Sequence, residues 1–116
     1  KSTLDRLADA VSSRGMKIFA RIDFAADAAG SDMSLPATEL LVFGNPKVGT
    51  LLLQKKQLIG IDLPLKALAW ASSGDSWLAY NEPSYIATRH EVGLDDTVAK
   101  MTAALRSAAE EAVAIN

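Results

Sequence analysis

Turn-forming segments that interrupt apolar runs between residues 40 and 85 constrain this chain most strongly. The apolar run 40–43 ends in GNPKVGT at 44–50, and two further turns follow, IDLPLK at 61–66 and YNEPSY at 80–85. Polar-tipped segments held by a rigid apolar core are where binding and catalytic groups tend to lie. The spacing therefore predicts a candidate site, while it identifies no reaction.

The periodicity around these turns predicts one domain of the α+β class, because 116 residues leave room for a single core. The last two strands are joined by a hairpin turn at 72–75. We therefore expect a mainly antiparallel sheet with the helices packed on one face. We expect helices at 2–14, within 24–32 and ending near Gly30, at 45–56, 81–90 and 95–114, and strands at 17–23, 39–43, 65–71 and 76–80.

The first predicted strand alternates apolar and polar residues, which is typical of a half-buried strand. Ile18, Ala20 and Ile22 are expected to point to one side. Asp23 ends this strand, and its simplest role is to cap the alanine-rich helix that follows.

Four further positions have the residue types of helix ends. Asn45 precedes Pro46 and is expected to cap a helix with proline in its first turn. Asn81 fits a cap in front of the next short helix, Gly93 fits its end, and Asp95 or Asp96 fits the cap of the last helix.

Two tryptophans fall on the two strands of the predicted hairpin. Trp70 and Trp77 lie on either side of the turn, so we expect a cross-strand aromatic pair. On an outer face of the sheet, such a pair would suit a protein–protein interface.

The charge balance argues against several classes of protein. Twelve Lys and Arg against 14 Asp and Glu give a net charge of −2, which is unlike a nucleic-acid-binding domain. No apolar run approaches the roughly 18 residues that span a bilayer, so we expect neither a nucleic-acid nor a membrane partner. The chain begins with Lys1 rather than Met, which suggests a trimmed or mature soluble product, cytoplasmic or exported.

The shortage of soft and titratable side chains limits the chemistry further. There is no cysteine and one histidine, so thiolate sites are excluded and neither a metal nor a cofactor is expected. His90 is better explained as a helix C-terminal residue than as a base, because its neighbour Glu91 points elsewhere. No serine lies in a nucleophile-elbow context.

The segments at 43–50, 62–66 and 80–85 together resemble the bacterial and archaeal family called domain of unknown function 302. The likeness covers about 2–90, followed by the predicted helix at 95–114. The resemblance implies a curved antiparallel sheet backed by helices, like that of TATA-binding protein, and a homodimer as a common state. It implies no settled activity. It also implies a strand before the first helix, which this sequence does not contain, so either that strand has been removed or one sheet edge lies open.

The glycine-rich segment Gly44–Thr50 comes close to a phosphate-binding loop but lacks its lysine. Thr50 stands where a P-loop carries the lysine that reaches the phosphates, and Pro46 lacks an N–H. A nucleoside triphosphatase is therefore disfavoured. A carboxylate or single phosphate near Lys47 at the helix N-terminus remains open, as does a purely structural turn.

The favoured hypothesis is a non-enzymatic homodimeric module that binds a small ligand able to carry negative charge. One alternative is a small hydrolase or isomerase that uses Asp62 as base with Lys66 or His90, and it requires a raised Asp62 pKa. Another is a purely structural dimerisation or adaptor domain. The expected ligand-binding residues are Asn45, Lys47, Asp62, Lys66, Tyr80 and Asn81.

Overall fold

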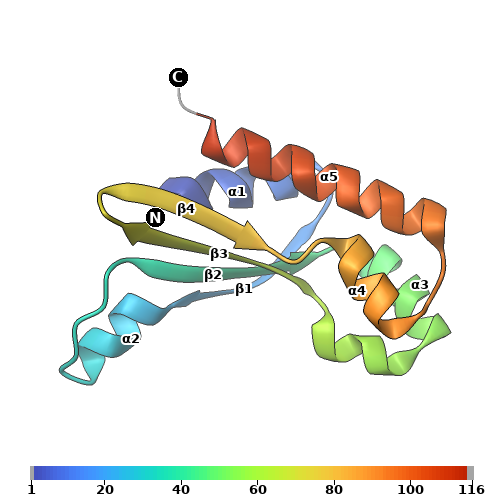
Figure 1. Ribbon diagram of the computed structural model, residues 1–116, viewed down its shortest axis with the longest axis horizontal. Coiled ribbons are helices and arrows are strands. Elements are labelled where there is room, and N and C mark those ends of the chain that lie inside the picture. Colours follow the sequence, from blue (N-terminus) through green and yellow to red (C-terminus); the bar gives the residue numbers. More distant parts are fainter. Residues whose placement is uncertain (1, 115–116) are drawn as a thin grey trace.

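A computed structural model describes residues 2–114 of the chain, which form one layer of strands and a set of helices (Figure 1). Every predicted helix and strand is present, with ends shifted by one or two residues. The prediction missed the 3₁₀ helix η1. In chain order the elements are α1 (Ser2–Ser13), β1 (Lys17–Asp23), α2 (Phe24–Gly30), β2 (Thr38–Gly44), α3 (Pro46–Lys55), η1 (Gln57–Asp62), β3 (Leu65–Ser72), β4 (Asp75–Tyr80), α4 (Pro83–His90) and α5 (Asp95–Val113).

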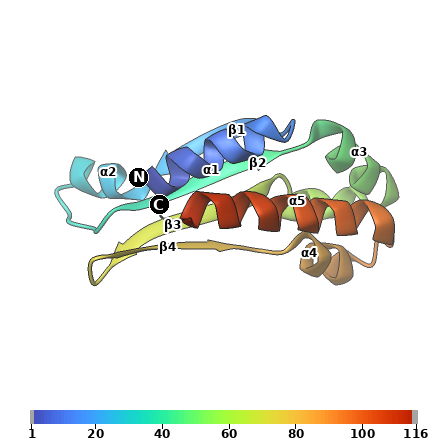
Figure 2. The same cartoon turned by 90° about the horizontal axis from the view of Figure 1, so that it is seen from above.

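The sheet has the strand order β1-β2-β3-β4, and each neighbouring pair is antiparallel. The long helix α5 and the first helix α1 pack against each other on one face of the sheet (Figures 1 and 2). This confirms the predicted α+β class with an antiparallel sheet and helices on one side. The shorter elements α3, η1 and α4 gather at one end of the sheet, and α2 lies at the other (Figure 1).

The core lies between the sheet and the helices α1 and α5. Alternate residues of the central strands, such as Leu41 and Phe43, point into it because successive side chains of a strand face opposite ways. Leu4 and Leu7 meet them from α1, at the spacing of one helical face. The other fully buried members of this core are Ala10, Val11, Ile59, Leu105, Ala108 and Ala112.

Two of the predicted helix caps are confirmed. The Asp23 side chain accepts a hydrogen bond from the Ala26 N–H at 2.9 Å, which caps α2. Asn45 caps α3, and Pro46 occupies the first turn, where a missing N–H costs nothing.

The other predicted helix ends are wrong. α4 is preceded by Glu82 rather than Asn81, and no side chain caps it. Leu94 precedes α5, so Asp95 and Asp96 lie in its first turn. There their carboxylates stabilise the helix by interacting with the positive end of its dipole. α4 ends at His90, before Gly93.

The half-buried alternation predicted for β1 is also wrong. All seven residues of this edge strand are exposed, and a bulge lies at Phe19. Ile18 pairs with Phe43, whereas Ala20 pairs with Val42, so the extra residue sends Ile18 and Ala20 to opposite faces.

The face of the sheet away from α1 and α5 is apolar, and its described residues stay exposed or half-buried. We call it the open face. Trp70 and Trp77 are direct cross-strand partners there, with stacked rings 6.5 Å apart, as the sequence predicted. From the strand register, the open face is largely apolar and carries the side chains of Lys17, Ala20, Ile22, Thr38, Leu40, Val42, Lys66, Leu68, Trp70, Ser72, Asp75, Trp77 and Ala79.

Candidate functional site

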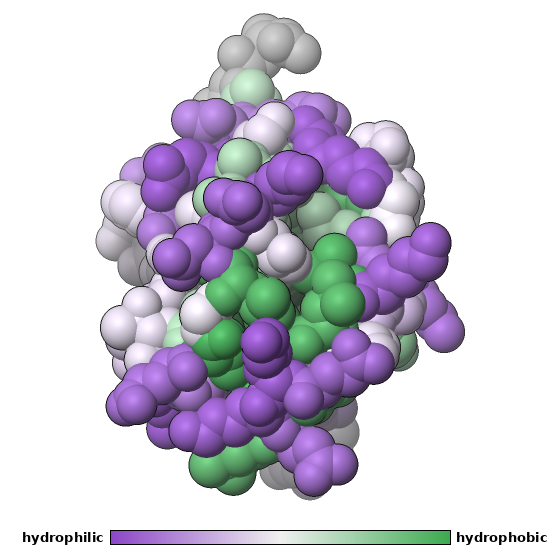
Figure 3. Space-filling model, turned by 90° about the vertical axis from the view of Figure 1, so that its right-hand side faces the viewer, coloured by the Kyte–Doolittle hydropathy of each residue, from purple (hydrophilic) through white to green (hydrophobic). Residues whose placement is uncertain are grey.

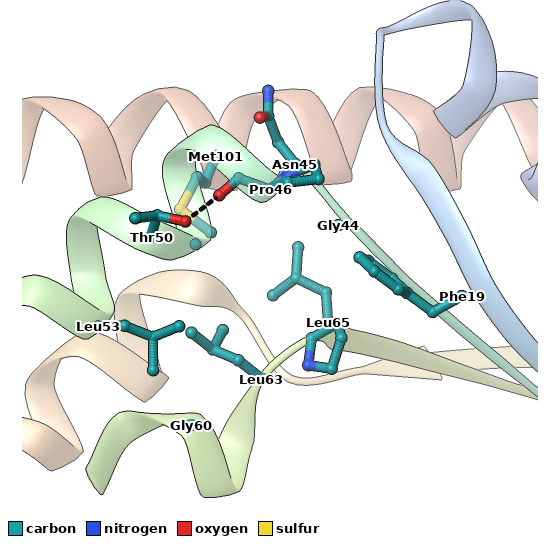
Figure 4. A pocket seen from close by; sticks show the side chains of 12 residues that line it. Phe19, Gly44, Asn45, Pro46, Thr50, Leu53, Gly60, Leu63, Leu65 and Met101 are labelled. Atoms are coloured by element: carbon teal, nitrogen blue, oxygen red, sulfur yellow. Dashed lines mark hydrogen bonds between the residues drawn. The ribbon is translucent and has the colours of Figure 1, made fainter. Parts of the chain in front are cut away.

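A cavity of about 270 Å³ opens at the end of the sheet where β2 leads into α3 and η1 leads into β3. Figure 3 views this end of the molecule and shows a hollow lined by hydrophobic side chains and bordered by hydrophilic ones. Figure 4 shows three leucines turned toward this space: Leu53 from α3, Leu63 from the link between η1 and β3, and Leu65 from β3. The lining residues are Phe19, Gly44, Asn45, Pro46, Gly49, Thr50, Leu53, Gly60, Leu63, Pro64, Leu65 and Met101.

Two glycines line this cavity where a side chain would take up space. A Cβ placed on Gly49, inside α3, would meet no atom within 4 Å. A Cβ on Gly60, in η1, would come within 3.2 Å of the end of the Leu53 side chain. The space in front of Gly49 is therefore part of the cavity volume and would be filled by a larger side chain.

The first N–H groups of α3 are already occupied. The N–H groups of Lys47 and Val48 donate to Asn45 Oδ1 at 3.0 and 3.4 Å, and the Gly49 N–H donates to the Asn45 carbonyl at 2.8 Å. Pro46 has no N–H to offer. The backbone therefore does not form a phosphate cradle, and an anion at this helix would depend on side chains such as Lys47.

The six predicted ligand residues do not share one cavity. Asn45 lines the hollow, although Figure 4 shows its amide pointing away from Leu63 and Leu65. Lys47 is exposed in the first turn of α3. Lys66 pairs with Val42 and lies on the open face.

Tyr80 and Asn81 lie at the end of β4, where the chain turns into α4. Tyr80 is half-buried against the core, and Asn81 is exposed. Nearby, Arg106 of α5 donates to Glu82 at 2.6 Å. Glu82, and to a smaller extent Tyr80, hold the pKa of the Arg106 guanidinium above its ordinary value. The Arg106–Glu82 pair therefore links α5 to the start of α4, and neither Tyr80 nor Asn81 lines the cavity.

Asp62 belongs to a polar cluster with two residues at the end of α4. Its Oδ2 lies 2.5 Å from His90 Nε2 and 3.1 Å from Arg89 Nη1. His90 is buried, with 5% of its surface exposed. Asp62 is thus the carboxylate that orients the buried histidine and ties η1 to α4. The prediction of His90 as a helix C-terminal residue is confirmed, since it ends α4.

This cluster gives no support to Asp62 as a general base. The hydrogen bond from His90, with smaller contributions from the charges of Arg89 and Lys66, holds the pKa of Asp62 below its ordinary value. A base that works near neutral pH needs a shift in the opposite direction. No local pattern could indicate this pair, because Asp62 and His90 lie 28 residues apart.

Residues 2–114 lack two further kinds of feature. In that range no three His, Cys, Asp or Glu side chains lie close enough together to hold a metal ion. Within the same range, no helix has both the length and the apolar composition that crossing a membrane requires.

These features define a small α+β domain with an apolar cavity at one end of an antiparallel sheet. The chain belongs to the family described as domain of unknown function DUF302, which matches residues 1–112. This confirms the resemblance seen in the turn motifs, and the matched range includes all of α5 but its last residue.

A solved structure supports the fold independently. A DUF302 protein from Bacillus stearothermophilus, described as an uncharacterized conserved protein, superposes with a TM-score of 0.84. The superposition covers 95% of this chain and 88% of the other, at 16% sequence identity. At that identity the comparison shows a shared fold.

Curated relatives come from Brucella. Proteins named fluoride-specific ion channel FluC 1, from Brucella suis and Brucella abortus, are each 48% identical to this chain over 98 residues. The matched part is 84% of this chain but 39% and 36% of those proteins. The chain therefore spans well under half the length of these relatives.

Proposed function

We propose that this domain is a non-enzymatic binding module whose cavity takes a small, mainly apolar organic molecule. The observation that carries the proposal is the apolar hollow of about 270 Å³ between α3, η1 and the ends of β2 and β3. Ligand sites are typically apolar pockets with a few polar groups that fix orientation. The cavity is apolar in this way. Its polar side chains are Asn45, whose amide points away from Leu63 and Leu65, and Thr50, whose hydroxyl donates to the Pro46 carbonyl.

The polar end of such a ligand would lie toward the N-terminus of α3. Lys47 is exposed in that turn, so its ammonium group would attract a carboxylate. Of the six residues expected to bind ligand, Asn45 and Lys47 are those we retain. Asp62, Lys66, Tyr80 and Asn81 lie outside the cavity lining.

Two substitutions at Gly49 test the cavity directly. Gly49→Phe should fill the space in front of the helix, whereas Gly49→Ala should leave it nearly unchanged and raise stability by about 1 kcal/mol through helix propensity. Octanoate and octanol are suitable probes because they share an apolar chain and differ in charge. Binding is measured from the unfolding midpoint and from NMR chemical shifts of the lining residues.

We expect both probes to bind the wild type and Gly49→Ala, and neither to bind Gly49→Phe. Lys47→Gln should weaken the binding of octanoate and leave the binding of octanol unchanged. Equal binding to Gly49→Phe, or no shift at the lining residues with either probe, would overturn the cavity as the binding site.

The Brucella relatives support a role as an accessory module. In those proteins a region similar to this chain accounts for less than two-fifths of the length, and the proteins carry the name of an ion channel. A small domain that binds a ligand for a larger protein fits this arrangement better than an independent catalyst does.

A second candidate function is homodimerisation through the open face. Trp77 is 52% exposed, and it stacks on Trp70 beside Leu68 and Leu40. Exposed aromatic residues on an apolar face are typical of interface centres. A second copy packed on the open face would bury this row, and a strict monomer at high concentration, measured by light scattering, would contradict it.

A further inference from the structure

The helix α3 and the 3₁₀ helix η1 form a projecting end of the molecule, which we call the α3–η1 tip (residues 46–62). Its charge is opposite to that of the chain as a whole. Between Glu39 and Asp62 the sequence has three lysines, at positions 47, 55 and 56, and no acidic residue, whereas the whole chain carries a net charge of −2. All three lysines are exposed.

The tip also exposes large apolar side chains. Leu58 and Ile61 of η1 are 63% and 70% exposed, and Leu51 of α3 is 46% exposed. Leu58 and Ile61 are three residues apart in a 3₁₀ helix, so they lie on the same face. Leu51 and Lys55 are four residues apart on α3 and share a face in the same way.

The acidic residue at the edge of the tip does not offset the lysines. Asp62 is engaged by Arg89 and His90 of α4, and the charge of Arg89 balances that of its carboxylate. A surface of exposed leucine and isoleucine beside lysines, without a free carboxylate between them, is a combination found where proteins lie on membrane surfaces.

We propose that the α3–η1 tip docks on an anionic lipid surface. Leu58 and Ile61 enter the boundary between headgroups and acyl chains, and Lys55 and Lys56 meet the negatively charged headgroups. Charge complementarity selects this occupant over a zwitterionic bilayer, and the protruding apolar side chains select it over nucleic acid. A surface contact requires no spanning helix. The proposal therefore revises the expectation of no membrane partner, which rested on the lack of an apolar run long enough to span.

Co-sedimentation with lipid vesicles tests this proposal. We expect the wild type to pellet with vesicles of equal parts phosphatidylcholine and phosphatidylglycerol, and to remain in solution with phosphatidylcholine alone. Binding should weaken as salt is added, because exposed charges are screened. Lys55→Gln with Lys56→Gln should lower the partition coefficient about tenfold or more.

Leu58→Ser with Ile61→Ser should also abolish pelleting. The matched control is Met33→Ser with Leu35→Ser, because these side chains are 69% and 44% exposed but lie beside α2 at the opposite end of the sheet (Figure 1). This control should bind as the wild type does. Far-ultraviolet circular dichroism checks that each variant is folded.

Three results would overturn the proposal. The first is no binding of the wild type to anionic vesicles. The second is equal loss of binding in the Met33 and Leu35 control. The third is self-association that depends on Leu58 and Ile61, which would show that the tip packs against a second copy. None of these results depends on whether the cavity binds octanoate, so this proposal and the proposed function fail separately.

Discussion

The two faces of the sheet are built from the same kinds of residue but have different surroundings. On β2, Leu41 is fully buried beneath α1 and α5, while its neighbour Leu40 lies half-exposed on the open face. On β3 and β4 the contrast is similar, since Leu65 and Ala67 are buried and Trp77 is exposed.

The comparison shows that hydrophobicity along a central strand does not reveal which face is covered. Both faces of β2 are apolar, as in strands that are buried on both sides. Two helices cover one face, and the described part of the chain leaves the other open. The exposed apolar residues of the open face are therefore the feature that favours a binding partner, and a second copy of the chain would be one.

Adjacent leucines on β2 give the most direct test of this comparison. Leu41→Ala should lower the free energy of unfolding by about 2–5 kcal/mol, because it leaves a cavity in a packed core. Leu40→Ala should cost about 1 kcal/mol or less in the monomer, because its side chain already contacts water. Denaturant titrations at low protein concentration measure both values.

Protein concentration provides the control for this pair. If the open face is covered by a second copy, the cost of Leu40→Ala should grow as the concentration rises, while the cost of Leu41→Ala stays constant. Equal costs for the two leucines at every concentration would remove the distinction between the faces.

Trp77→Ser should have the next largest effect, on assembly rather than on the fold. Removing a central aromatic residue from an interface typically costs about 2 kcal/mol or more, which corresponds to roughly a thirtyfold rise in the dimer dissociation constant. Sedimentation equilibrium measures this constant. The control is Tyr85→Ser, because Tyr85 is 59% exposed on α4, away from the open face. A dimer that is as stable with Trp77→Ser as without it would place the interface elsewhere.

Much of the fold could be predicted from local sequence because the signals were local. Asp23 and Asn45 cap helices within their own turns, and the hairpin places Trp70 opposite Trp77. The predictions failed where the conformation of the backbone, and not a side chain, sets the boundary or the facing of an element. Leu94 precedes α5 in the left-handed region at φ 56°, and no residue type announced that conformation. The bulge at Phe19 likewise leaves an ordinary alternating pattern in the sequence.

The candidate site was harder to predict because it depends on contacts between distant segments. The turn around Asn45 and Gly49 does lie at the cavity, which the sequence indicated. Asp62, however, meets His90 across 28 positions, and Met101 reaches the cavity from α5. Turn residues indicate where the chain bends. Which of these turns lie together at one cavity depends on how α4 and α5 pack, and local sequence does not show that packing.

The smallest expected effect is on the pH dependence of stability, which should distinguish the open face from the helices at the end of the sheet. The open face carries Lys17, Lys66 and Asp75, whereas the Asp62 and His90 pair lies among the helices at the end of the sheet. The folded pKa of Asp62 is below its unfolded value of about 4, so its stabilising contribution is present above that pH. That contribution is lost as the pH falls through the folded pKa.

Asp62→Asn should therefore reduce the loss of unfolding free energy between about pH 5 and pH 2, while lowering stability at neutral pH. Urea titrations across this range measure both effects. Asp75→Asn, an exposed carboxylate at the start of β4, is the control and should leave the pH profile close to that of the wild type. An Asp62→Asn profile that keeps the full acid slope would show that the link between η1 and α4 does not depend on the charge of Asp62.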